Sequence, residues 1–212
     1  MDCAFADYDG VAGGWHDAVF VYLLREGLAD SYTYPYHEVK GLCTTSIARP
    51  YYAVNWDYVP AGGTVGGEIV PTNDSLKQAI YSYGPIACAV ISKGWDNYST
   101  TDASGNQNPD WGRDFPNGVF SGTPNSQCDS RDVSHEILIV GWDDAQQVWL
   151  VRNSWGTSWG IQGYMKLRFQ TSLVGYGAAW ITAAPAGAVS DKLRYQLHRL
   201  DAAGSAPRPT VR

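Results

Sequence analysis

Five short apolar stretches in the second half of the chain limit what it can fold into. Turn-forming residues separate them, and they read IACAVI (86–91), GVF (118–120), HEILIVGW (135–142), VWLVRNSW (148–155) and GYMKLRF (163–169). Each stretch is strand-sized, and β-branched and aromatic residues favour strands. Their succession predicts an antiparallel barrel or half-barrel. With helices from the first half of the chain added, the predicted fold class is α+β.

Two helices are predicted in the first half of the chain. The first occupies residues 15–27 and ends on a glycine that suits a helix C-terminus, and its apolar stripe consists of Trp15, Val19, Tyr22 and Leu23. The second stops at Gly84-Pro85 and begins at a polar cluster with three candidate caps, which are Asn73, Asp74 and Ser75. We therefore expect these two helices to pack against the predicted strands.

Three further segments are polar or rich in glycine. Residues 95–117 are full of Gly, Pro, Asn and Asp and predict a long surface loop. The stretch GGTVGGEIV (62–70) lacks the G-K-[ST] that completes a phosphate-binding loop, so we expect a turn or an edge strand there. Residues 186–212 have Ala-, Gly- and Pro-rich flanks, which predict a tail or linker that contains at most a short helix.

The charge and the cysteines exclude several classes of function. A formal net charge of -6 argues against attraction to nucleic acid or to anionic lipid. No apolar stretch of the sequence approaches the roughly 20 residues needed to cross a bilayer, so we expect no membrane partner. The four cysteines, at positions 3, 43, 88 and 128, match no metal-binding spacing. We therefore expect neither a metal nor another cofactor.

Two segments of the second half resemble a known family. SHEILIVGW (134–142) and WLVRNSWGTSWGIQGYMKLR (149–168) are similar to the histidine and asparagine segments of papain-family cysteine peptidases. Three further landmarks follow that family's order, and they read DCAFADYDGVAGGWHDAVFVYL, YTYPY and YGPIACAV. The resemblance covers residues 2–185. It implies a papain-like two-lobe fold, incomplete here, with a β half-barrel lobe, a remnant of the helical lobe, and an N-terminally truncated peptidase domain over residues 1–185.

The resemblance assigns catalytic roles to His135 and Asn153. A thiol is a strong nucleophile only as its thiolate. A nearby imidazolium stabilises this thiolate, and the same imidazolium later protonates the leaving amine. His135 would be this acid and base. The amide oxygen of Asn153 would fix the ring's orientation, and Trp155 would shield their hydrogen bond from water. The alternatives are a structural histidine at a strand start and an asparagine that only shapes a turn.

A second group of residues is implied to bind substrate. Gly13 and Gly14 would let an extended peptide approach the backbone closely enough to form strand-like hydrogen bonds. The pocket for the second residue before the scissile bond would be walled by Trp15, His16, Ala89 and Val133, with Ser134 beside that wall. The alternative for Trp15 is packing in the core of the helical segment.

The nucleophile that the resemblance implies is missing from this chain. In the family it lies in a segment of the form C-G-S-C-W, preceded by a glutamine that helps to bind the oxyanion, and the sequence contains no such segment. Cys3 and Cys43 match half-cystines that form one disulfide. Cys88 is expected to be buried and inert, and Cys128 matches a half-cystine whose partner region, GYGAAW, has no cysteine. We expect the chain alone to be an inactive and fragile fragment.

The sequence therefore predicts a hydrolase, namely a cysteine-type peptidase that acts on peptide or protein substrates. Further partners would be the missing N-terminal segment or a propeptide. The first alternative is a non-catalytic pseudo-peptidase that binds extended peptides, and the second uses Cys3 as an N-terminal nucleophile. The chain shows no signal peptide, but the resemblance points to a secreted, periplasmic or lysosome-like compartment.

Overall fold

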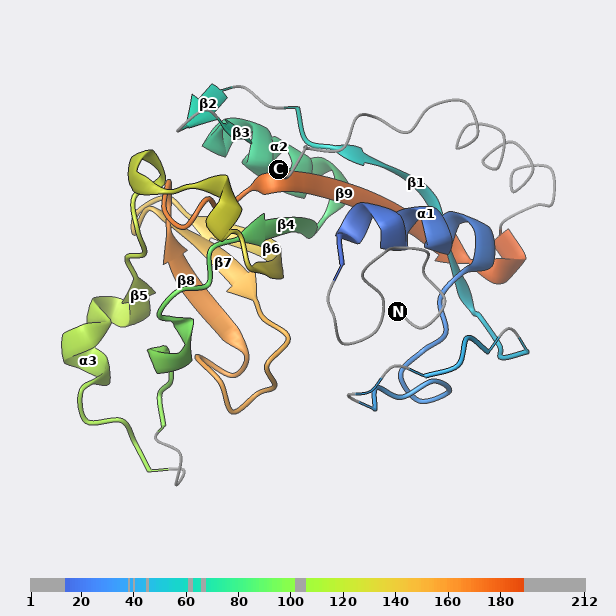
Figure 1. Ribbon diagram of the computed structural model, residues 1–212, viewed down its shortest axis with the longest axis horizontal. Helices are drawn as coiled ribbons and strands as arrows, with labels where there is room; N and C mark the ends of the chain where they lie inside the picture. The colour runs from blue at the N-terminus through green and yellow to red at the C-terminus, as the bar shows by residue number, and fades with distance from the viewer. Residues whose placement is uncertain are drawn as a thin grey trace. The chain divides into compact units, whose positions relative to one another are not determined.

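The computed structural model describes residues 14–37, 39, 41–44, 46–60, 63–65, 68–101 and 106–188. They form two compact units, and each is described by itself. The first unit contains the described residues up to Asp57 and those from Ile181 onward, and the second contains the described residues from Tyr58 to Trp180 (Figure 1). None of the helices among these residues is long and apolar enough to cross a membrane.

The first unit contains the predicted N-terminal helix, α1 (His16–Glu26). It ends where the sequence indicates, because the N–H of Gly27 donates to the carbonyl of Leu23 and Gly27 takes a φ of 76°. The predicted apolar stripe was wrong, since the buried residues are Asp17, Phe20 and Leu24. The helix is apolar on several sides, so spacing alone did not single out the face that packs against the ring of Trp56.

Seven strands form one sheet in the order β1 (Tyr51–Tyr58), β9 (Tyr176–Pro185), β4 (Ile86–Val90), β6 (His135–Asp143), β7 (Val148–Arg152), β8 (Tyr164–Arg168) and β5 (Val119–Phe120). All five predicted strands are present, and the mixed α+β class is confirmed. The sheet is not wholly antiparallel, because β5 runs parallel to β8. Strands β6 and β7 intervene between them along the chain and provide the crossover that a parallel pair requires.

The remaining short strands and helices connect this framework. The predicted turn or edge strand at 62–70 is a separate pair, β2 (Gly63–Val65) with β3 (Glu68–Val70). Short 3-10 helices are η4 (Asn125–Gln127), η5 (Ser130–Asp132) and η6 (Ala186–Ala188). The tail predicted for 186–212 lies outside the described residues from 189 onward.

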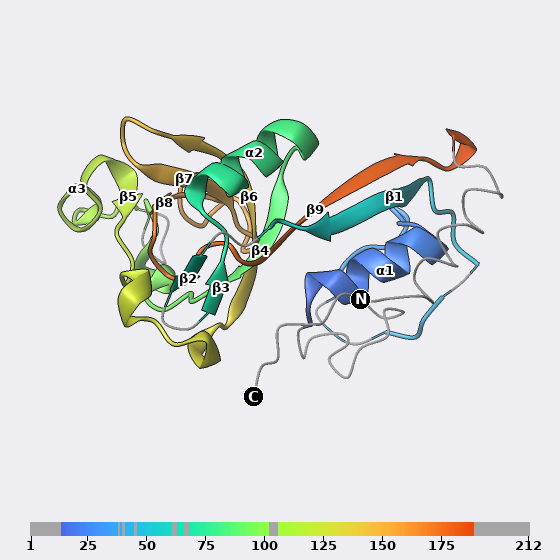
Figure 2. The ribbon, with the colours of Figure 1, turned by 90° about the horizontal axis from the view of Figure 1, so that it is seen from above.

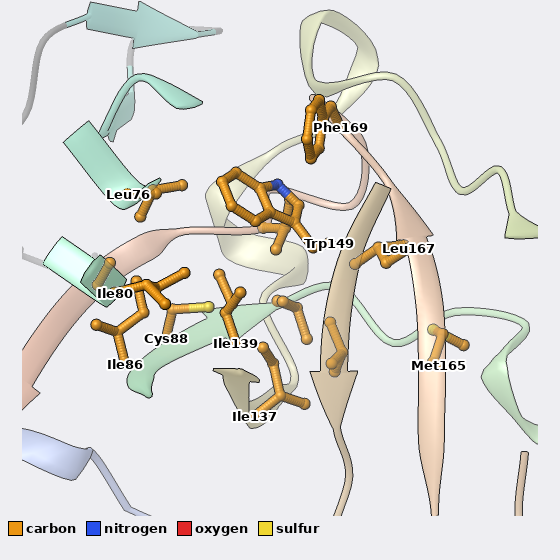
Figure 3. Close-up of a cluster of buried hydrophobic side chains, with 14 of the residues drawn as sticks. Leu76, Ile80, Ile86, Cys88, Ile137, Ile139, Trp149, Met165, Leu167 and Phe169 are labelled. Carbon is orange, nitrogen blue, oxygen red and sulfur yellow. The ribbon is translucent and has the colours of Figure 1, made fainter. Parts of the chain in front are cut away.

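Helix α2 (Asn73–Tyr83) covers one face of the sheet in the second unit (Figure 2). Its N-cap is Thr72, one residue before the predicted candidates, and the Thr72 side chain accepts from the N–H of Ser75 at 3.1 Å. The helix ends at Gly84, as predicted. Its apolar face joins the sheet in a core that Figure 3 shows, whose members include Leu76, Ile80, Ile86, Cys88, Ile139, Trp149, Met165 and Leu167.

The predicted surface loop at 95–117 is partly wrong. It contains η2 (Trp95–Asn97), α3 (Trp111–Asp114) and η3 (Pro116–Gly118), while 102–105 lie outside the described residues. Trp95 and Tyr98 are fully buried. The Tyr98 hydroxyl donates to the carbonyl of Gly118 at 2.5 Å and accepts from the backbone N–H of Lys166 at 3.2 Å. Aromatic burial thus anchors a segment whose average composition is polar.

Candidate functional site

Neighbouring antiparallel strands bring His135 and Asn153 to the same end of the sheet. His135 is the first residue of β6 and lies opposite Val90 of β4. Asn153 directly follows β7, whose last residue, Arg152, pairs with Leu138 of β6. Since β6 and β7 run in opposite directions, the start of one strand lies beside the end of the other. Residues 18 positions apart in sequence therefore meet.

The two side chains form a hydrogen bond. The Nε2 atom of His135 lies 2.8 Å from the Oδ1 atom of Asn153. The same oxygen accepts from the backbone N–H of Ser154 at 2.8 Å. A backbone N–H only donates, so the amide atom that it meets must be the oxygen and not the nitrogen. Nε2 of His135 must then carry a hydrogen and donate it.

This bond fixes the protonation pattern of the neutral imidazole. With its hydrogen on Nε2, the neutral ring has its unprotonated nitrogen at Nδ1. Asn153 is buried, with 8% of its surface exposed, so water competes weakly for its oxygen. The ring thus presents an oriented proton acceptor at Nδ1, which becomes a proton donor after it takes up a proton.

Two tryptophans, Trp95 and Trp155, contact the ring of His135, and a third, Trp159, supports them. We call these three tryptophans the aromatic bracket. The ring of Trp155 lies 5.0 Å from that of His135, and the ring of Trp95 lies 5.9 Å away and nearly perpendicular. Trp159 contacts both other members, at 5.3 Å and 6.2 Å. Its Nε1 also donates to the carbonyl of Trp95 at 3.1 Å. Trp155 is 38% exposed, whereas Trp95 is fully buried.

Sequence reasoning identified Trp155 but assigned no role to the other two members of the bracket. Trp159 lies in the NSWGTSWG motif, so the signal for it was present in the sequence. Trp95 lies in a polar segment, and no local pattern connects it to a histidine 40 positions later. The contact between their rings depends on the fold.

The predicted substrate-binding residues divide between the two units. Ala89 is buried in β4, next to the residue that pairs with His135, and Val133 and Ser134 directly precede His135. The structure thus brings these three to the same strand ends as the histidine. Ser134 is held there because its N–H donates to the carbonyl of Val90 at 3.0 Å, and its hydroxyl lies 3.1 Å from that of Ser92.

The other predicted substrate-binding residues belong to the first unit. Gly14 is exposed, Trp15 directly precedes α1, and His16 begins that helix, where its ring lies 5.5 Å from that of Phe20. Gly13 lies outside the described residues. The role of these residues in binding peptide stays a prediction.

Two cysteines of the second unit are free thiols. Cys88 is fully buried in β4, and burial raises the pKa of its thiol well above the ordinary range. Cys128 is half-buried, and burial also raises the pKa of its thiol, although the N–H groups of Leu173 and Ser172 lower it in part. Both thiols are therefore held in the protonated, weakly nucleophilic form at neutral pH. Cys3 lies outside the described residues, so the disulfide between Cys3 and Cys43 stays a prediction.

Comparison with known proteins gives this geometry a context. The sequence model of the protein family described as "Papain family cysteine protease" matches residues 1–183 of this chain. "Cathepsin L 1" of Paramecium tetraurelia is 32% identical over 168 residues, which cover 79% of this chain and 42% of that protein. "Ananain" of Ananas comosus is 30% identical over 172 residues, which cover 79% of this chain and 40% of ananain. The chain thus spans about two fifths of the length of these curated relatives.

Solved structures support the same fold. The bromelain protease from Ananas comosus, in complex with the E64 inhibitor, is 23% identical, has a TM-score of 0.62, and matches over 85% of this chain and 75% of its own. Digestive procathepsin L 3 of Tenebrio molitor larval midgut is 25% identical and has a TM-score of 0.54. The match covers 85% of this chain and 53% of the procathepsin chain.

Proposed function

Because the chain belongs to the papain family of cysteine proteases, we propose that His135 and Asn153 form the acid–base half of a cysteine peptidase site. The observation that carries the proposal is the 2.8 Å contact between Nε2 of His135 and Oδ1 of Asn153. A histidine held in this way has one nitrogen committed to orientation and the other available for proton transfer. That division of labour is what thiol activation requires.

In the proposed reaction, Nδ1 of His135 takes the proton of a cysteine thiol, and the thiolate attacks the carbonyl carbon of the peptide bond. The protonated ring then gives this proton to the leaving amine, as the C–N bond breaks and a thioester remains. Nδ1 next takes a proton from water, whose oxygen attacks the thioester. The same proton returns to the departing thiol, and the carboxylic acid product leaves. Asn153 holds the ring through both steps.

The proposed thiol belongs to a cysteine outside these 212 residues. Cys88 is sealed in the core, and burial raises the pKa of the thiols of both Cys88 and Cys128. Cys3 and Cys43 are reserved for the predicted disulfide. The chain would therefore act only together with a segment that supplies the nucleophile. Its substrates would be peptides or proteins, in a secreted, periplasmic or lysosome-like compartment where that disulfide persists.

The test adds the missing group. A chimera would join the N-terminal part of ananain, through its nucleophilic cysteine, to residues 2–212 of this chain. We expect it to hydrolyse a fluorogenic peptide amide, and the His135→Gln variant to lose at least about 100-fold in kcat/KM. The control is His37→Gln, which changes a histidine outside the proposed site.

Two results would contradict the proposal. A folded chimera without activity would reject the acid–base role of His135. Hydrolysis by the unmodified chain that disappears in Cys3→Ser would instead place the nucleophile at Cys3.

The alternative is a non-catalytic protein that holds extended peptides. It is favoured by the protonated state of Cys88 and Cys128, which leaves these two thiols weakly nucleophilic. Fluorescence anisotropy of labelled casein peptides with the unmodified chain separates the two readings. Saturable binding without cleavage, by the chain and by a folded but inactive chimera alike, would favour the pseudo-peptidase.

A further inference from the structure

We infer that Trp95 is a positioning residue for His135, because it fixes the plane of the imidazole and thereby the direction of Nδ1. The kinetic part of this inference rests on the proposed function, whereas its structural part does not. The observation behind it is the perpendicular contact between the two rings, with centroids 5.9 Å apart and an interplanar angle of 89°.

A single hydrogen bond does not immobilise an imidazole. The bond from Nε2 to Asn153 fixes one atom of the His135 ring, but the ring can still tilt about that contact. Trp155 lies on the ring as well, yet it is 38% exposed and borders solvent. A second, rigid contact is needed to define the plane, and Trp95 is the fully buried ring that supplies it.

Trp95 is suited to this task because it is itself held from several sides. Its carbonyl accepts from Nε1 of Trp159 at 3.1 Å and from the N–H of Tyr98 at 2.9 Å. Its ring stacks on Trp159 at 6.2 Å and meets Phe120 edge-on at 6.3 Å. An aromatic ring that is held by its own neighbours moves little, so it restricts the tilting of the ring that it touches.

The contact also opposes a flip of the imidazole. A half-turn about the Cβ–Cγ bond would exchange Nε2 with Cε1 and remove the hydrogen bond to Asn153. The perpendicular arrangement with Trp95 is one of the favoured aromatic geometries, so tilting away from it has a cost. Trp95 and Asn153 thus act on the same ring from different elements, η2 and the turn after β7.

The experiment compares two buried tryptophans. Trp95→Leu removes the contact, and Trp149→Leu serves as the matched control, since Trp149 is equally buried and its ring contacts Phe169. Nitrogen-15 spectra of the imidazoles report the tautomers of His135 in the 212-residue chain, with its signals identified by their loss in His135→Gln. We expect the minor, Nδ1-protonated tautomer to rise about 3- to 10-fold in Trp95→Leu and to stay unchanged in Trp149→Leu.

Two further measurements distinguish a specific effect on the orientation of the His135 ring from a general loss of core packing. Trp95→Phe keeps an aromatic ring and should restore most of the wild-type tautomer ratio, which also covers the case in which Trp95→Leu fails to fold. In the ananain chimera, Trp95→Leu should lower kcat more than Trp95→Phe does, while KM stays constant in both variants. Equal tautomer changes in Trp95→Leu and Trp149→Leu, or no change in any Trp95 variant, would overturn the inference. A tautomer change with an inactive chimera would retain it and reject the proposed function.

Discussion

The Oδ1 atom of Asn153 receives two hydrogen bonds at 2.8 Å, one from Nε2 of His135 and one from the backbone N–H of Ser154. The second bond identifies the oxygen and thereby determines which nitrogen of the histidine bears hydrogen. The orientation of the candidate base therefore depends on a backbone amide of the turn that follows β7.

Removal of the Asn153 amide should release the histidine. In Asn153→Ala, Nε2 of His135 loses its acceptor, so both neutral tautomers become populated and folding stability falls by about 1–2 kcal/mol. Nitrogen-15 spectra and urea denaturation measure these effects. Ser154→Ala keeps the backbone N–H and serves as control. A single Nε2-protonated tautomer in Asn153→Ala would show that another group orients the ring.

The Tyr98 hydroxyl should contribute measurably to stability. Tyr98→Phe leaves the carbonyl of Gly118 and the N–H of Lys166 without their partner, which costs about 1–3 kcal/mol. Urea denaturation measures the loss. Tyr81→Phe is the control, because Tyr81 is 84% exposed. Equal midpoints for Tyr98→Phe and the wild type would mean that water replaces both bonds.

The same residue predicts sensitivity to alkaline pH. Burial raises the pKa of Tyr98 to about 12 from an ordinary value of 10.0. The stability that the neutral phenol provides is complete below pH 10.0 and is lost as the pH rises toward about 12. Thermal melts between these limits should show a steeper decline for the wild type than for Tyr98→Phe. Parallel declines would assign the alkaline loss to other groups.

Asn125 should stabilise a turn with unusual backbone angles. Its Oδ1 accepts from the N–H of Leu173 at 2.8 Å, and Leu173 is fully buried with a φ of 52°. Asn125→Ala removes the acceptor from a buried amide and should lower stability by about 1–3 kcal/mol. Chemical denaturation is the measurement, with the exposed neighbour Ser126→Ala as control. A loss no larger than that of Ser126→Ala would refute the assignment.

The carboxylate of Asp129 should titrate at unusually low pH. The Arg131 guanidinium and backbone N–H hold its pKa at about 2, below the ordinary 3.8. This local interaction is complete above pH 3.8 and is lost as the pH falls through about 2. Carbon-13 titration of the Asp129 carboxyl measures the midpoint, and Arg131→Ala should move it upward. An unchanged midpoint in Arg131→Ala would exclude the guanidinium as the cause.

The sequence predicted those features that local patterns encode. The glycine at 27 ends α1, and the apolar runs became β4 to β8, because turn residues and strand-forming side chains act over a few neighbouring positions. His135 and Asn153 were identified because each lies within a distinctive motif.

Features that depend on distant partners escaped prediction. The segment beginning WDNYSTTD looks exposed, yet Trp95 and Tyr98 are buried by contacts with Trp159 and Lys166, more than 60 positions later. The face of α1 was misjudged for a related reason, since only the packing against Trp56 selects Phe20 over its apolar neighbours.

The partial exposure of Trp155 gives the molecule a built-in optical sensor. Of the nine tryptophans, all within the described residues, it is the most exposed, and its ring lies 5.0 Å from the imidazole. Dissolved quenchers such as acrylamide should collide with this indole more often than with the other eight. A polypeptide that covered His135 would shield this indole as well, so a fall in acrylamide quenching would report the contact without any attached dye.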